Sequence, residues 1–97
     1  MAAVSVSAQK HFICDFGLAV RQLREARGWS QEELAAHAAL NRSYVGEIER
    51  GQVTPSLATL HKLALALQVR PPELLIHTEH IDTTRQRHRL HLVAIAG

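Results

Sequence analysis

Two helix-start signals lie close together in the middle of this 97-residue chain. The residues Ser-Gln-Glu-Glu at 30–33 have the form of a capping box, in which the serine hydroxyl accepts a backbone N–H and the glutamate carboxylate reaches back. Asn41, a favoured N-cap residue, precedes the next helical stretch, which stops at Gly51. The chain is therefore constrained to form two short helices, ending near 38 and spanning about 42–50, with a very short turn between them.

Apolar residues at steps of three and four predict three further helices around this pair. The first begins near Phe12 and is closed by Gly28, while Ser56 caps a longer one over 57–67. Two prolines at 71 and 72 fit the first turn of a short last helix that ends near 77. The apolar positions expected to face the core in the last two helices are Leu57, Leu60, Leu63, Ala64 and Leu67, followed by Leu74, Leu75 and Ile76.

A chain of this length can close only one modest hydrophobic core. Apolar residues make up 46% of it and aromatic residues only 4%, so Leu, Ala, Val and Ile must fill that core, as in a compact helical domain. We therefore predict an all-α fold with five helices in one domain over 12–77. Residues 1–11 are interpreted as a flexible arm. The tail, 78–97, is expected to be disordered, to add a strand or to serve in dimerisation.

Cysteine content and charge limit the compartment and the partners. The single cysteine, Cys14, cannot form an intramolecular disulfide and is interpreted as a small buried hydrophobic residue. The sequence has neither a secretory signal pattern nor an apolar run of the ~20 residues that a membrane span needs, which favours a cytoplasmic protein without a membrane partner. The net charge of +2 comes from Lys10 and the RQRHR cluster at 85–89, so affinity for DNA depends on where charges lie.

The helix over 42–50 has one side turned to the core and one turned away from it. At 100° per residue, Val45 and Ile48 point to the core, and the opposite side is small, polar and basic at its ends. An arginine can fork onto guanine, a serine can bond a base edge and a glutamate can accept from cytosine. Glycine inside a helix costs ~1 kcal/mol relative to alanine, and close approach to DNA would explain it. We predict four base-reading residues, Arg42, Ser43, Gly46 and Glu47; an ordinary solvated helix face is the alternative.

Three segments together carry a family resemblance. They read SQEELA, then NRSYVGEIERG, then TPSLATLHKLALAL, and they resemble the lambda-repressor and Cro-type helix-turn-helix family, also called the xenobiotic response element family, over about 16–75. The residues RSY before IERG are similar to those of controller proteins of restriction-modification systems. The resemblance implies a five-helix lambda-repressor-like fold and a sequence-specific, double-stranded DNA-binding transcriptional regulator, a repressor or an autoregulator.

The resemblance also implies roles for individual residues. Arg42, Ser43 and Glu47 fall on the base-reading positions of the family. An ion pair between Arg24 and Glu49 is implied as well, and the helical wheel independently places Glu49 on the inward side of its helix. The residues expected to contact DNA phosphates are Gln31, Asn41, Tyr44 and Arg50.

Two residues depart from the family pattern. Trp29 stands where an aliphatic residue is usual and is expected to be a buried or half-buried anchor. Ala39 stands where the turn between the two helices usually has glycine.

One such domain contacts too little DNA for operator-level discrimination, so we expect a homodimer on a palindromic operator with half-sites ~34 Å apart. The interface is predicted in residues 74–81 or in the apolar tail LHLVAIA. No cofactor and no metal are expected.

Other interpretations are weaker. The pairs His77/His80 and His88/His91 have a spacing that suits one helix face, but zinc sites of this kind normally add paired cysteines. An enzyme is not expected, because there is neither a recognisable nucleophile with its base nor a glycine-rich phosphate loop. A protein-interaction module, such as an antitoxin-like partner-binding protein on the same fold, stays open.

Overall fold

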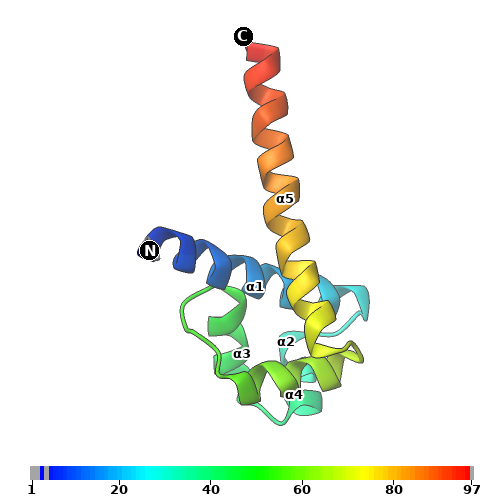
Figure 1. Cartoon of the computed structure of the whole chain (residues 1–97). Helices are drawn as coiled ribbons and strands as arrows, with labels where there is room; N and C mark the ends of the chain where they lie inside the picture. Colours follow the sequence, from blue (N-terminus) through cyan, green and yellow to red (C-terminus); the bar gives the residue numbers. More distant parts are fainter. Residues whose placement is uncertain (1–2, 4, 97) are drawn as a thin grey trace.

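Five α-helices make up the computed structural model, which describes residues 3 and 5–96 (Figure 1). They are α1 (Val6–Ala26), α2 (Gln31–Ala38), α3 (Arg42–Glu49), α4 (Leu57–Leu67) and α5 (Pro71–Ala96). No strand occurs among the residues described, so the predicted all-α class with five helices is confirmed. Helices α2, α3 and α4 gather around α1, and α5 rises out of this group as a rod (Figure 1). No helix of this described part is long and apolar enough to cross a membrane.

Side-chain caps fix where the middle helices begin. The Ser30 hydroxyl accepts from the Glu33 backbone N–H at 3.1 Å, and the Glu33 carboxylate accepts from the Ser30 N–H at 3.1 Å, which completes the predicted capping box. Asn41 caps α3 by accepting from the Ser43 N–H at 2.8 Å, and Ser56 caps α4. Each cap satisfies backbone donors that a helix start leaves without partners.

Ala39 closes α2 in the left-handed conformation, with φ 54° and ψ 46°. Its N–H donates to the Ala36 carbonyl, and the next N–H, of Leu40, donates to the Ala35 carbonyl at 2.9 Å. This reversal turns the chain directly from α2 into α3. The conformation is costly for a residue with a Cβ, so the departure from glycine noted in the sequence stores local strain.

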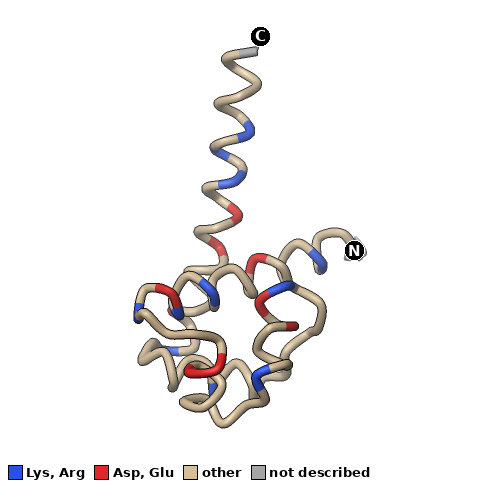
Figure 2. Tube along the Cα trace, turned by 180° about the vertical axis from the view of Figure 1, so that it is seen from behind, with Lys and Arg blue, Asp and Glu red and all other residues tan. Residues whose placement is uncertain are grey.

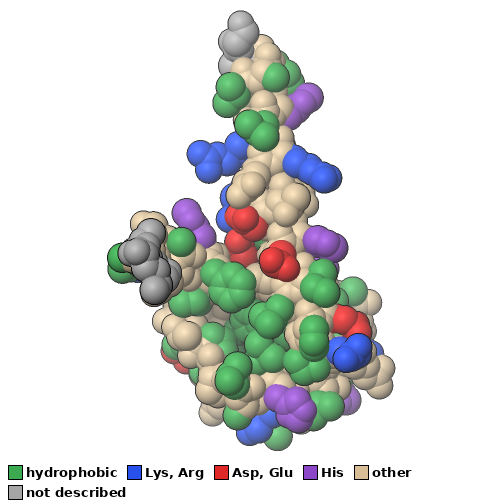
Figure 3. Space-filling model, viewed as in Figure 1, with side chains coloured by type: hydrophobic (Ala, Val, Ile, Leu, Met, Phe, Trp, Pro, Cys, Tyr) green, Lys and Arg blue, Asp and Glu red, His purple; other side chains and the backbone are tan. Residues whose placement is uncertain are grey.

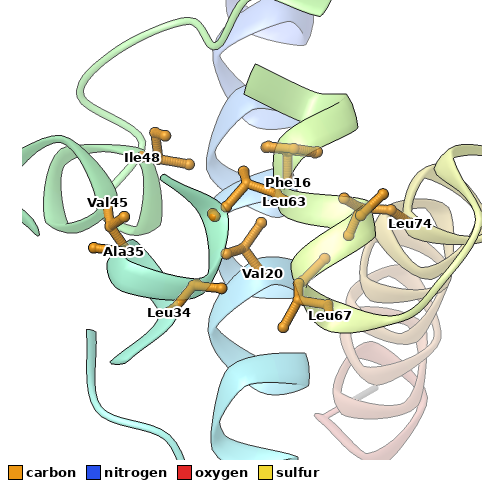
Figure 4. Close-up of a cluster of buried hydrophobic side chains, with 12 residues drawn as sticks. Phe16, Val20, Leu34, Ala35, Val45, Ile48, Leu63, Leu67 and Leu74 are labelled. Carbon is orange, nitrogen blue, oxygen red and sulfur yellow. The ribbon is translucent and has the colours of Figure 1, made fainter. Parts of the chain in front are cut away.

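The hydrophobic core lies where α1 passes between the other helices (Figure 4). Its members come from all five helices, and none exposes more than 4% of its surface. Because α1 supplies the centre, each remaining helix needs only one apolar side. The core residues are Phe16, Ala19, Val20, Leu34, Ala35, Ala38, Val45, Ile48, Leu63, Ala64, Leu67 and Leu74.

Two of the predicted core positions are wrong. Leu57 is 85% exposed because it is the first residue of α4, on the solvent side of the capped turn. Ile76 is 49% exposed because it lies on the side of α5 that faces away from the core, while Leu75 is half-buried.

The first helix begins earlier than the sequence indicated, so the predicted flexible arm over 1–11 is wrong for residues 6–11. Ser5 caps α1 by accepting from the Ala8 N–H at 3.3 Å, and Ala8 and His11 of the added turns line a depression shared with α5. Residues 1, 2 and 4 of the predicted arm lie outside the described residues.

The last helix is not short but continues to Ala96, which makes disorder or a strand over 78–96 wrong. Thr78 is buried, with its hydroxyl donating to the Leu74 carbonyl at 2.9 Å. Further along, Arg85 forms an ion pair with the buried carboxylate of Asp15 on α1. Contact with α1 therefore holds the helix through its first four turns, and the remainder projects freely (Figure 1).

Candidate nucleic-acid interface

A surface depression of about 430 Å³ lies at the junction of α2, α3 and the turn that follows. It collects residues that the sequence singled out for DNA contact from two different helices. The short turn between α2 and α3 fixes the relative position of the two helices, which form the walls of this depression. Its lining residues are Gln31, Arg42, Ser43, Gly46, Glu47, Arg50 and Gln52.

Helix α3 divides into a buried and an open side, as the helical wheel indicated. Val45 and Ile48 are fully buried in the core. Arg42 and Ser43 are exposed at its start, and Glu47 is half-buried at the depression. The open side therefore offers an arginine fork, a hydroxyl and a carboxylate within two turns of helix, the group types that distinguish base pairs in a major groove.

Gly46, which was expected to let DNA approach closely, is instead buried, because other side chains cover it. A Cβ at this position would lie 3.0 Å from Arg50 Nη1 and 3.5 Å from Gln31 Oε1. The glycine therefore leaves room for two predicted phosphate-contacting residues to fold over α3. This packing is a reason for glycine in the helix that the sequence alone did not reveal.

The Glu49 carboxylate binds side chains from two other helices at the inner edge of the site. Glu49, 6% exposed, accepts from Arg24 Nε at 2.7 Å and from Arg24 Nη2 at 2.9 Å, and the same carboxylate accepts from Gln31 Nε2 at 3.0 Å. Arg24 also donates to the Trp29 carbonyl at 2.8 Å. The hydrogen bonds that Arg24 donates to Glu49 raise the pKa of its guanidinium. The implied ion pair is thus present, and it joins α1, α2 and α3 at one point.

Two predicted phosphate-contacting residues lie outside the depression. Asn41 is exposed, but its side chain caps α3. Tyr44 is half-buried, and its hydroxyl lies 3.3 Å from Thr59 Oγ1 of α4. Both contribute to the position of α3, and their phosphate contacts remain predictions.

Gln52 is a lining residue that the sequence analysis missed. Its side-chain oxygen accepts from Arg50 Nε at 3.3 Å, which orients the arginine. The preceding Gly51 has φ 70°, and a Cβ there would lie 2.7 Å from Cys14 Sγ, so the turn rests directly on α1. Cys14 itself is exposed, so the expectation of a buried cysteine is wrong. The signal for Gln52 was its position just after a glycine that ends a helix.

Trp29 is half-buried, within the expected range, and anchors the loop before α2. Its ring stacks on His37 at 4.2 Å between centroids, and the Arg27 guanidinium lies 4.8 Å over it. This stack replaces the aliphatic packing that the family pattern suggested.

The charged residues are distributed differently over the globular part and over α5. Basic and acidic residues are interspersed over the globular part, whereas on α5 the acidic residues Glu73, Glu79 and Asp82 are followed by the basic residues Arg85, Arg87 and Arg89 (Figure 2). Within the described part of the chain no group of three or more His, Cys, Asp or Glu is arranged to hold a metal ion. His77 instead bonds Gln22 at 2.9 Å.

Comparison with known proteins identifies the family of this chain. Residues 20–74 match the family described as Helix-turn-helix. The chain is 44% identical over 64 residues to the control protein C.BamHI of Bacillus amyloliquefaciens, covering 65% of this chain and 79% of that protein. The chain therefore belongs to the helix-turn-helix family of DNA-binding transcriptional regulators.

Two solved structures are similar to this chain in fold, and one of them was solved as an assembly on DNA. The restriction-modification controller protein C.AhdI from Aeromonas hydrophila is similar with a TM-score of 0.63 and 52% identity, over 64% of this chain and 94% of that one. The controller protein C.Esp1396I, solved as a tetramer with its natural 35 base-pair operator, has a TM-score of 0.63 and 26% identity, over 69% of this chain and 92% of that one. Other matching regulators are longer, and the chain spans 28% of one and 54% of another.

Proposed function

We propose that this protein regulates transcription as a homodimer that binds a palindromic operator and inserts α3 into the major groove of each half-site. The observation that carries the proposal is the depression over α2 and α3. It places an exposed Arg42 and Ser43 beside Glu47 on a helix whose other side is locked in the core. Base edges are read by such side chains on a rigid helix. The proposal assigns the chain no catalytic role and places its action in the cytoplasm.

Phosphate contacts would set the register. Gln31 stands at the first position of α2, where backbone N–H groups favour an anion, and Arg50 stands at the far end of α3. Glu49 and Gln52 orient these two side chains, and both lie over Gly46 at the edge of the reading surface. Such contacts fix position on the duplex and carry no sequence information.

Dimerisation is supported by the operator-bound assembly of C.Esp1396I and by the exposed apolar residues of α5. Within the interface predicted at 74–81, Leu74 and Thr78 are buried in the domain and are excluded as interface residues. The residues that remain available are Ile76, Leu90, Leu92, Val93 and Ile95.

Selection of DNA from a random pool, followed by fluorescence titration over a salt series, tests the proposal. We expect wild type to bind a selected site with an affinity that falls steeply with salt, and Arg42→Ala to lose about 1 to 3 kcal/mol and to relax the preference at one base position. Arg70→Ala, which removes an exposed arginine outside the depression, is the matched control. No selected sequence, or an Arg42 variant that binds like wild type, would favour the protein-interaction module.

A further inference from the structure

Helix α5 has a second face that lies outside the hydrophobic core, and two of its members, Glu79 and Thr83, also border the depression between α5 and α1. Its Leu74 and Thr78 side is buried, at 0% and 1% exposure. The opposite side holds exposed residues at steps of three and four, which on a helix fall within an arc of about 80°. We name this side the outer face of α5, and it consists of Ile76, Glu79, Thr83, Arg87 and Leu90.

The outer face is self-complementary about Thr83. Ile76 and Leu90 stand seven residues on either side of Thr83, and Glu79 and Arg87 stand four residues on either side. A half-turn about Thr83 therefore brings each apolar residue against an apolar residue of a second copy. The same operation brings each acidic residue against a basic one.

The charges on this face lack partners inside the chain. Among the residues that the structure describes, the ion pairs within 4.0 Å involve neither Glu79 nor Arg87. A parallel arrangement of two outer faces would oppose Glu79 to Glu79 and Arg87 to Arg87, which repel. An antiparallel arrangement opposes unlike charges at both places. The charge pattern thus selects the direction of pairing.

The apolar ends of the face are well exposed. Ile76 exposes 49% of its surface and Leu90 71%, with Val93 beside it at 69%. Figure 3 shows apolar side chains at the far end of α5 and again on the globular part below it, with basic, acidic and histidine side chains between. Two apolar contacts that flank a charged centre would bury both ends of the face at once.

We infer that α5 is the self-association surface, and that it pairs antiparallel with α5 of a second copy about Thr83. The partner is therefore the same chain. The inference rests on the homodimer of the proposed function and adds its geometry: Ile76 packs on Leu90 of the partner subunit, and Glu79 pairs with Arg87 of the partner subunit.

Cysteine cross-linking separates the two directions of pairing. In a Cys14→Ser background, equal amounts of Ile76→Cys and Leu90→Cys protein are mixed without DNA, equilibrated and oxidised. Antiparallel pairing predicts a covalent dimer that contains one copy of each variant, identified by mass, and little product from either variant alone. Cross-linking of Leu90→Cys with itself, or no product in the mixture, would overturn the inference.

A charge exchange tests the same contact without cysteine. Sedimentation equilibrium in the absence of DNA should show dimerisation weakened about tenfold by Glu79→Arg or by Arg87→Glu, since each creates two like-charge contacts. The double variant should restore dimerisation, because both pairs are formed again with reversed sign. Arg89→Glu, on another side of the helix, is the matched control. Failure of the double variant to recover would contradict the pairing.

The two proposals fail in distinguishable ways. If the charge exchange rescues dimerisation while no DNA sequence is selected, the pairing is supported and the proposed function is contradicted. If the protein selects an operator but sediments as a monomer, or dimerises equally well in all charge variants, the pairing is overturned and DNA recognition stands.

Discussion

Arg24 on α1 and Glu49 at the end of α3 are joined by two hydrogen bonds, of 2.7 and 2.9 Å, across 25 residues of sequence. The Glu49 side chain is only 3% exposed and the Arg24 side chain 12%. The pair therefore lies under the reading surface, where water cannot replace either partner. It connects the helix at the centre of the core with the helix that presents Arg42 and Ser43.

Glu49→Ala should lower the free energy of unfolding by about 3 to 5 kcal/mol, because it leaves the Arg24 charge buried without its partner. Thermal unfolding followed by circular dichroism measures the effect. Glu25→Ala, which removes an exposed partner of Arg21 that also lies 4.0 Å from Arg24 Nη2, should cost less than about 1 kcal/mol. A Glu49 variant that melts within a degree or two of wild type would contradict the role given to the pair.

Ala39→Gly should stabilise the protein by about 0.5 to 1 kcal/mol. It relieves a left-handed backbone at φ 54° and loses part of the gain to the greater entropy of the unfolded chain. Ala36→Gly, an exposed position inside α2, should destabilise by about 1 kcal/mol. Chemical denaturation compares the two variants, and equal signs would show that backbone conformation at 39 is not the cause.

Gly17→Ala should displace α3 relative to α1. A Cβ at Gly17 would lie 2.3 Å from the Ile48 carbonyl oxygen and 2.7 Å from that of Glu49, and these backbone atoms cannot rotate away. We expect a loss of about 3 kcal/mol, at the upper end of the cost of overpacking, together with weaker DNA binding. Gly28→Ala has open space around its Cβ and should cost about 1 kcal/mol from its φ of 72° alone. Similar melting temperatures for the two variants would argue against close helix packing at Gly17.

Arg85→Ala should loosen α5 where it leaves the domain. The variant leaves the carboxylate of Asp15, 3% exposed, without its cation, and because the Arg85 side chain is 38% exposed we expect a cost of about 1 to 2 kcal/mol. Amide hydrogen exchange over 80–96 should accelerate, while exchange in α2 and α3 should not. Arg89→Ala, outside this ion pair, is the control. Unchanged exchange along α5 would show that the helix is held by other contacts.

The sequence predicted the middle of the fold better than its ends, and the reason is local. Ser30, Asn41 and Ser56 each cap the start of a helix by accepting a hydrogen bond from a backbone N–H two or three residues later. A short window of sequence therefore contains the signal. The continuation of α5 as far as Arg85 is supported instead by Asp15, seventy residues away, and polar residues interrupt any apolar stripe over 78–89. The early start of α1 has a local cap at Ser5, and its residues Ala8 and His11 face α5 across a depression, a tertiary relationship that periodicity does not encode.

In the candidate site, too, the features with a local signal could be predicted and those that depend on tertiary contacts could not. The open side of α3 came from helical periodicity, since Val45 and Ile48 fix which side is buried. The cover over Gly46 and the place of Gln52 could not be predicted, because they depend on tertiary contacts, namely the bond from Gln31 to Glu49 and the turn at Gly51 that rests on Cys14. Tyr44 was assigned to phosphate contact from the family pattern, and its bond to Thr59 is a tertiary contact that periodicity does not encode.

The hydrogen bonds that Glu49 accepts from Arg24 and Gln31 have a thermodynamic consequence for recognition. The relative orientation of α2 and α3 is settled during folding, so the entropic penalty of ordering the helix pair does not fall on the binding step. Selectivity then depends on the few side chains that keep rotational freedom at the surface, chiefly Arg42 and Ser43. Exchanging those two residues should redirect sequence preference on an otherwise unaltered scaffold, whereas changes beneath them alter every target alike.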